Sequence, residues 1–388
     1  ILEIGYCTNV HAGVDLEATQ ANLSKYAARV KQLVSPHDPM GIGLWLAAPA
    51  AQQLLDSKQT TVFRDWLDEQ GLVPFTLNGF PYGNFHNEVV KHDVYKPTWH
   101  ELDRLQYTKN LATILDTILP AGKTGSISTL PIAWGKQSLT TEQWDAAVRQ
   151  LLELADFLDE LQQTTGRTIH VCIEPEPGCV LDVAADIIDL FQNRLLPHGS
   201  ADKILHHIRV CHDVCHSAVM FESQADVLRR YQTLGIQVGK IQVSSAVQVN
   251  FAKLAASDRT AAFEQLASFN EPRYLHQTCI RESNQTIHFH QDLSAALETV
   301  TEPQSLESTW SVHFHVPIFL ESLGLLSTSQ HDILECMEVC KSMPNLEHFE
   351  VETYAWSVLP EHLQRSDLAQ GIADELLWFR NLVSAEKS

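Results

Sequence analysis

Two cysteines, two histidines and an aspartate occupy the stretch from Cys211 to His216 in RVCHDVCHSAV (209–219). Side chains of these types can bind a metal ion, form a redox pair, or close a strand with polar groups. Cys211 and Cys215 lack the CxxC spacing of a zinc ribbon, and a strand that runs into a loop gives such thiols no fixed geometry. We therefore expect both thiols to fill the core and Asp213 to face a functional cavity.

Polar side chains, most of them carboxylates and imidazoles, lie at the ends of five strand-like segments along the chain. They are Glu174 and Glu176 in 168–176, Asp213 and His216 at the end of 208–214, Gln242 and Ser244 in 239–245, His313 and His315 in 310–317, and Glu350 and Glu352 in 346–354. Oxygen and nitrogen donors of this kind suit hard-to-borderline divalent cations such as Mn²⁺, Mg²⁺ or Zn²⁺. Because the pattern spans several strands, it predicts a divalent-metal site where those strands end.

The elements that position these residues follow one rhythm, in which short apolar runs alternate with segments of helical period. Three runs, at 2–10, 41–47 and 72–80, come before a long excursion, and the five segments named above come after it. The run GSISTLPIAWG (125–135) is interpreted as a strand or hairpin outside this alternation. Eight strand–helix units predict an α/β fold, a (β/α)8 TIM barrel, whose chemistry lies at the carboxyl ends of its strands.

A single domain over 1–388 is expected, because no repeat, low-complexity tract or flexible linker interrupts the chain. Two insertions in the barrel are expected, at about 81–140 and 270–300. Thr140 and Gln143 have the spacing of a capping box, which predicts that a helix begins there.

Composition and charge narrow the classes of partner. Lys and Arg number 27 against 48 Asp and Glu, so the net charge of −21 argues against a nucleic-acid partner. No apolar run is long enough to span a bilayer, and the first residues lack the basic start and cleavage site of a signal peptide. The eight cysteines are scattered as in a reduced protein, so a cytoplasmic location is expected.

Three motifs, VCIEPEPG, CHDVCH and VETYAW, resemble the metal-site strands of the xylose-isomerase-like TIM barrels. The metal set of that superfamily is a Glu closing strand four, an Asp closing strand five within D-x-x-H, a His on strand six and a Glu closing strand eight. The resemblance implies Glu174, Asp213 and Glu352 as ligands. The strand-six position falls on Gln242, a weaker ligand, and His313 or His315 could supply an imidazole from strand seven.

Over essentially 1–380 the chain also resembles the EboE family of metabolite traffic proteins. The motifs are YCTNVHAG, TLNGFPYGNFH, GSISTLPIAWG, CIEPEPGC, VHFHVPIF and HFEVETYAW. The resemblance implies a role in secondary metabolism with partner proteins from the same gene cluster, and it leaves the reaction open.

The expected function is a metal-dependent isomerase or epimerase of a sugar or sugar phosphate, with Glu174 and Glu352 as the acid–base pair. Candidate contacts to such a small polar metabolite are His11, Asn78, His216 and Tyr354. A non-catalytic metabolite-binding or trafficking protein is the alternative, which Gln242 favours. A phosphoester hydrolase of the endonuclease-IV kind is disfavoured by the negative charge and by Gln242.

Overall fold

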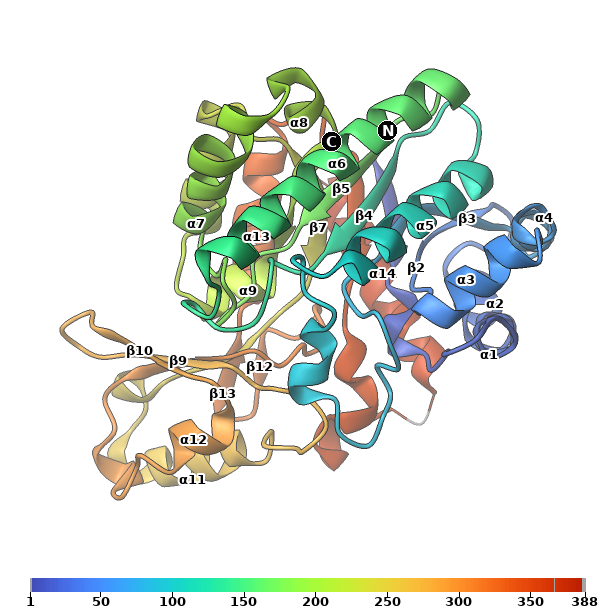
Figure 1. The fold of residues 1–388 in the computed structure, drawn as a ribbon. Coiled ribbons are helices and arrows are strands. Elements are labelled where there is room, and N and C mark those ends of the chain that lie inside the picture. The colour runs from blue at the N-terminus through green and yellow to red at the C-terminus, as the bar shows by residue number, and fades with distance from the viewer. Residues whose placement is uncertain (1, 366, 386–388) are drawn as a thin grey trace.

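The computed structural model describes residues 2–365 and 367–385, and its centre is a barrel of parallel strands (Figure 1). The eight strands are β1 (Glu3–Tyr6), β2 (Met40–Leu44), β3 (Leu72–Asn78), β4 (Gly125–Thr129), β5 (Ile169–Ile173), β6 (Ile208–Asp213), β7 (Val238–Val243) and β14 (His348–Val351). They pair in the order β1-β14-β7-β6-β5-β4-β3-β2, and a parallel bridge from Cys7 to Gly43 joins the two ends. The predicted TIM barrel is therefore confirmed.

Glycines allow the two end strands to meet. A Cβ on Gly5 would lie 2.9 Å from the carbonyl oxygen of Gly41, and one on Gly41 would lie 2.6 Å from that of Ile4. Side chains at these positions would hold β1 and β2 apart, so the sequence places none there.

Helices surround the barrel in the order in which the chain visits its strands (Figure 1). They are α1 (Leu16–Asn22), α2 (Ala28–Val34), α3 (Ala48–Asp56), α4 (Thr60–Glu69), α5 (Leu102–Ile118), α6 (Thr141–Thr165), α7 (Ala184–Asp189), α8 (Ala201–His207), α9 (Val214–Val219), α10 (Gln224–Thr233), α13 (Gln330–Cys340) and α14 (Leu368–Ala385). The capping box that opens α6 is confirmed, since Thr140 and Gln143 bond each other's backbone N–H groups, and Gly166 ends the helix at a φ of 74°. No helix within the described ranges has the length and apolar character needed to cross a membrane.

A second sheet lies between β7 and β14 in the chain and extends away from the barrel (Figure 1). Its antiparallel strands are β8 (Val247–Asn250), β9 (Thr278–Arg281), β10 (Ile287–His290), β11 (Thr309–Val312), β12 (Ser322–Leu323) and β13 (Leu326–Thr328), ordered β10-β9-β11-β8-β13-β12. Two helices, α11 (Ala256–Ala267) and α12 (Leu293–Leu297), accompany it. This inserted segment carries residues 313–315 to the barrel mouth.

Two strand assignments from the sequence are wrong. The run at 125–135 contains β4, a barrel strand, whereas the segment 310–317 contains β11, which belongs to the second sheet. Consequently Glu174 follows the fifth barrel strand, Asp213 ends the sixth and Gln242 lies on the seventh. Each is one strand later than expected from the sequence.

Candidate functional site

A cavity opens at the carboxyl ends of the barrel strands. It is lined by barrel residues, by the loop after β3 and by the inserted segment. The lining comprises Asn9, Asn78, Phe80, Pro81, Phe85, Val90, Lys91, Val94, Tyr95, Glu174, Glu176, His216, Tyr274, Leu275, His313, His315, Glu352 and Tyr354.

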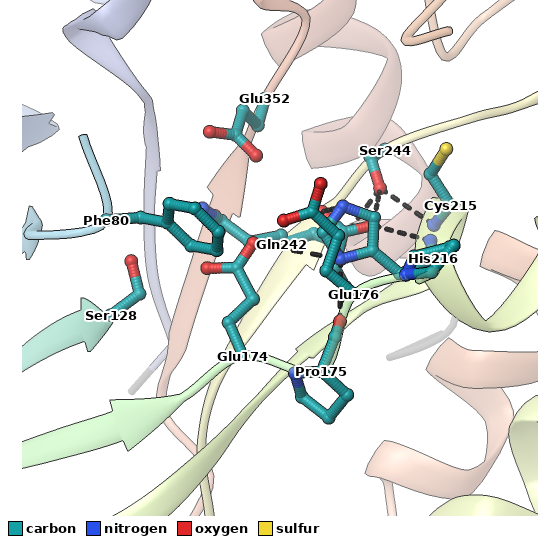
Figure 2. Close-up of polar contacts among 12 residues, drawn as sticks. Phe80, Ser128, Glu174, Pro175, Glu176, Cys215, His216, Gln242, Ser244 and Glu352 are labelled. Carbon is teal, nitrogen blue, oxygen red and sulfur yellow. Dashed lines mark hydrogen bonds and ion pairs between the residues drawn. The ribbon is translucent and has the colours of Figure 1, made fainter. Parts of the chain in front are cut away.

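Glu174, Asp213 and Glu352 form an acidic floor, in which each offers an oxygen within 4.8 Å of the others. Glu174 and Glu352 line the cavity itself, and Asp213 lies next to them. The barrel places them, since the Glu174 N–H continues the ladder to the Thr129 carbonyl at 3.0 Å. The Glu352 N–H likewise donates to Val243 at 3.1 Å. Figure 2 shows Glu174 and Glu352 reaching toward one space from different strands. Carboxylates separated by more than a hundred residues are thus brought together by strand order.

Asp213 divides its two oxygens between structure and cavity. Oδ1 caps α9 by accepting the His216 N–H at 2.9 Å, and it accepts the Ser244 hydroxyl at 2.7 Å. Oδ2 is buried and has no hydrogen-bond partner, as is Oε2 of Glu174. Buried carboxylate oxygens without partners are costly unless a cation or donor meets them, so this donor set fits a metal ion.

Three imidazoles lie beside the carboxylates in one tautomer. Nδ1 donates to the Pro175 carbonyl in His216 (2.8 Å), to the Gln277 amide oxygen in His313 (2.7 Å) and to the Glu352 carbonyl in His315 (2.6 Å). Because these acceptors have no proton to give, Nδ1 carries the proton, and in the neutral ring Nε2 has a free lone pair. A ligating histidine is usually oriented in this way, through its other nitrogen.

The free Nε2 atoms point at the acidic floor. In both His216 and His315, Nε2 lies 3.9 Å from Asp213 Oδ2. Three further sets of ligand-type atoms within 4.8 Å include Asp213–His216–His315, Glu176–His216–His313 and Cys215–His313–His315. The imidazoles expected from the seventh strand therefore arrive from the extended segment after β11.

Gln242 lies on β7, next to acidic residues of both neighbouring strands. Its register partners are Asp213 on β6 and Glu350 on β14, and both of its amide atoms are buried without a partner. An amide oxygen there is available to a cation or to a substrate hydroxyl.

The other predicted contact residues divide into two groups. Asn78, His216 and Tyr354 line the cavity, and the Asn78 amide donates to Glu352 Oε1 at 2.9 Å. The structure does not bring His11 to this cavity: it bonds the Tyr6 hydroxyl and stacks on Tyr26 beside a separate small pocket. His11 follows the short 3-10 helix Thr8–Val10 and is buried away from the acidic floor.

Several residues of the site had no signal in the sequence. Asn9 donates to Glu352 Oε1 at 2.7 Å. Tyr95 and Gln277 donate hydrogen bonds to the buried carboxylate of Glu176 at 2.6 and 2.9 Å. Asn9 and Tyr95 lie in short 3-10 helices and Gln277 lies in a loop, and such segments are too short or irregular for periodicity to mark the direction of a side chain.

The electrostatics of the floor follow from burial and crowding. Burial and the neighbouring carboxylates raise the pKa of Glu174 well above its usual range, and they raise that of Glu352 to about 8. Burial opposes ionisation of Asp213, but His216, His315 and the two hydrogen bonds to Oδ1 hold its pKa below the ordinary value. Burial also lowers the pKa of His315, to about 4. A divalent cation binds neutral imidazoles and ionised carboxylates, and its positive charge would offset the repulsion among the crowded carboxylates.

Comparisons with known proteins give similarity of structure only. No protein-family model matches the chain, and no curated protein does. The probable 3-DHS dehydratase AsbF of Bacillus anthracis is similar with a TM-score of 0.47 and 11% identity over 98% of this chain and 99% of that one. A xylose isomerase domain protein of Alicyclobacillus acidocaldarius has a TM-score of 0.47 and 10% identity over 99% and 100% of the two chains. The IOLI protein with a bound zinc atom has a TM-score of 0.46 and 11% identity over 99% of each chain. At these identities and scores, any function must be argued from this chain's own residues.

Proposed function

We propose that the chain is a divalent-metal-dependent isomerase or epimerase of a small hydroxylated carbonyl compound. The observation that carries the proposal is the convergence of Glu174, Asp213 and Glu352, with oxygens within 4.8 Å of one another and two of them buried without partners. A carboxylate cluster that only stabilised the fold would pair these oxygens with donors.

Glu174, Asp213 and Glu352 would hold the ion, with His315 and either His313 or Gln242 completing the set. Their mixture of oxygen and imidazole donors suits Mn²⁺, Mg²⁺ or Zn²⁺. When bound, such an ion holds adjacent substrate oxygens and polarises the carbonyl group.

The protein's own contribution is a pair of oriented carboxylates. Asn9 and Asn78 both donate to Glu352 Oε1, which fixes the carboxylate and leaves Oε2 toward the cavity. Glu174 reaches the same space from β5. One carboxylate removes the proton from the carbon next to the carbonyl, and the other returns a proton.

The motifs that resemble the EboE family support a finer assignment to that family, within the xylose-isomerase-like barrels. That assignment includes a place in a secondary-metabolite pathway, partner proteins from the same gene cluster and a cytoplasmic location. A non-catalytic carrier is the second candidate, because Gln242 replaces the histidine of the related barrels.

Metal analysis and activity together test the proposal. Purified protein incubated with Mn²⁺ or Zn²⁺ and then desalted is expected to retain about one divalent ion per chain. Glu174→Gln and Glu352→Gln are expected to weaken ion binding at least about 10-fold and to abolish turnover on a panel of aldoses and ketoses.

Glu222→Gln is the matched control. Glu222 is a half-buried carboxylate outside the cavity that accepts the Ala184 N–H. Glu222→Gln should bind the ion and turn over substrate as the parent protein does. A parent protein that retains no ion, or floor variants that bind it as tightly as the control, would overturn the metal-dependent assignment. Ion binding without turnover would favour the carrier.

A further inference from the structure

The upper half of the cavity differs in chemistry from its floor. Six apolar residues form much of its wall: Phe80, Pro81, Phe85, Val90, Val94 and Leu275. Phe80 and Glu174 belong to the same cavity, so the apolar wall begins directly beside the acidic floor (Figure 2).

An aromatic cluster continues this wall. The rings of Phe85, Tyr274 and Tyr354 pack on one another with centroids 5.0 to 5.4 Å apart. Tyr354 also lies 4.7 Å from the His315 ring, so the cluster ends above the imidazoles.

The phenol groups of the wall are largely committed to the protein. Tyr274 donates its hydroxyl to the Phe85 carbonyl at 3.2 Å, and Tyr95 donates to Glu176 at 2.6 Å while accepting from Gln277. What these two residues offer to a bound molecule is ring surface, which favours apolar atoms.

The charge of the cavity excludes an anionic substituent. Of the described residues that line it, Lys91 is the only lysine or arginine, and its ammonium group is paired with Asp292. Three carboxylates, Glu174, Glu176 and Glu352, face the same space. A divalent cation offsets two of these charges, so the field at the wall stays unfavourable to a phosphate.

Backbone donors do not replace the missing cations. The helix that begins at the floor, α9, already has its N-terminus capped by Asp213. Phosphate sites depend on Arg, Lys or free helix N-termini, and among the described lining residues only Lys91, which is paired with Asp292, is of this kind.

We infer that this wall is a subsite for an apolar ring or chain, and that the substrate is an uncharged compound with vicinal oxygens on an apolar body. A sugar phosphate is thereby excluded as the substrate. The inference rests on the proposed function, because the oxygens must meet a cation held at the floor.

Three probes with the same α-hydroxyketone head test the subsite: 2-hydroxyacetophenone, dihydroxyacetone and dihydroxyacetone phosphate. Their binding to the Mn²⁺-loaded protein is measured by calorimetry, with the ion content determined on the same sample. The phenyl compound is expected to bind at least about 10-fold more tightly than either of the others.

Val94→Lys places a cation at a half-buried position of the wall. It is expected to strengthen binding of dihydroxyacetone phosphate and to weaken that of 2-hydroxyacetophenone. Val62→Lys, at an exposed position, is the control and should leave the order of affinities for the three probes unchanged.

The outcomes separate the two proposals. If the protein holds the ion but binds dihydroxyacetone phosphate more tightly than the phenyl compound, the apolar subsite is wrong and the metal site stands. If the protein holds no ion and binds none of the probes, both proposals fall. A Val94→Lys variant that behaves like Val62→Lys also counts against the subsite.

Discussion

His315 donates through Nδ1 to the main-chain oxygen of Glu352 at 2.6 Å, which ties the inserted segment to the end of the last barrel strand. The other nitrogen of the ring then points at Asp213. His207 has the same arrangement elsewhere, with Nδ1 bonded to the Ile169 carbonyl at 2.9 Å and Nε2 buried without a partner. Comparing variants of these two histidines therefore distinguishes the contribution of a buried ring to packing from its contribution to cation binding.

His315→Ala is expected to lower the affinity for Zn²⁺ at least about 10-fold, because it removes one nitrogen donor and the bond that anchors the Glu352 backbone. His207→Ala should lower the free energy of unfolding about as much as His315→Ala does, but it should leave the affinity for Zn²⁺ unchanged. Competition with a chromophoric chelator measures the first quantity and urea unfolding the second. Equal Zn²⁺ affinity in both variants would contradict a ligand role for His315.

Glu375 on α14 is a buried carboxylate that joins the two segments carrying the site. It accepts the Ile318 N–H at 3.1 Å, the Thr353 hydroxyl at 2.5 Å and the Trp356 indole N–H at 3.0 Å. Burial raises its pKa from 4.5 to about 7. This role could not be predicted from the sequence, because Glu375 lies in an ordinary amphipathic helix.

A pH dependence follows from that shift. Between the two pKa values the folded protein keeps a proton that the unfolded chain loses, so the free energy of unfolding falls as pH rises through this window. The fall is at most about 1.4 kcal/mol per pH unit. Glu375→Gln should flatten the slope between about pH 5 and pH 7 in urea titrations, whereas the exposed Glu264→Gln should not. A parent slope matched by Glu375→Gln would refute this account.

Lys240 and Glu350 form an ion pair at 2.6 Å inside the barrel, and both side chains are fully buried. Lys240→Met would leave the Glu350 carboxylate without its counter-charge, at a cost of about 3–5 kcal/mol in unfolding free energy. Adding Glu350→Gln should recover most of that loss, since no buried charge remains. Guanidinium titration of the single and double variants tests this, and Lys96→Met in the exposed pair with Asp93 should cost no more than about 1 kcal/mol. A double variant no more stable than the single one would contradict the pairing.

Gly43 lies against the same carboxylate. A Cβ at this position would overlap Glu350 Oε1, so Gly43→Ala is expected to destabilise the protein by about 1–3 kcal/mol. Gly83→Ala is the matched control, because a Cβ there meets no atom within 4 Å. Thermal unfolding of the two variants is the measurement. Equal midpoints would show that the Glu350 side chain can move to accommodate a Cβ at position 43.

The barrel could be predicted because alternation of strands and helices is a local pattern, and the carboxylates because they directly follow strands. Two strands were misassigned for a physical reason. The segment GSIST of β4 has small residues such as Ser126 and Ser128, which the interior accommodates without an apolar run. Trp310 and Val312 of β11 alternate with period two just as a barrel strand does, and periodicity does not say which sheet a strand joins.

The loop residues of the site were beyond such reasoning. Tyr95 and Gln277 meet Glu176 only because the loop after β3 and the inserted segment fold onto the same mouth. The division of 1–388 into one domain with insertions stays a prediction, and the position of β4 shows that the stretch 81–140 includes a barrel strand.

The pairing of Glu3 with His348 means that the first strand of the barrel has no neighbour on one side until nearly the whole chain has been synthesised. Before then, β1 and β7 each present an open edge, and the inserted segment between β7 and β14 must emerge first. Ring closure therefore waits for β14, and a chain truncated within that segment would have seven of the eight barrel strands, two unpaired sheet edges and no Glu352.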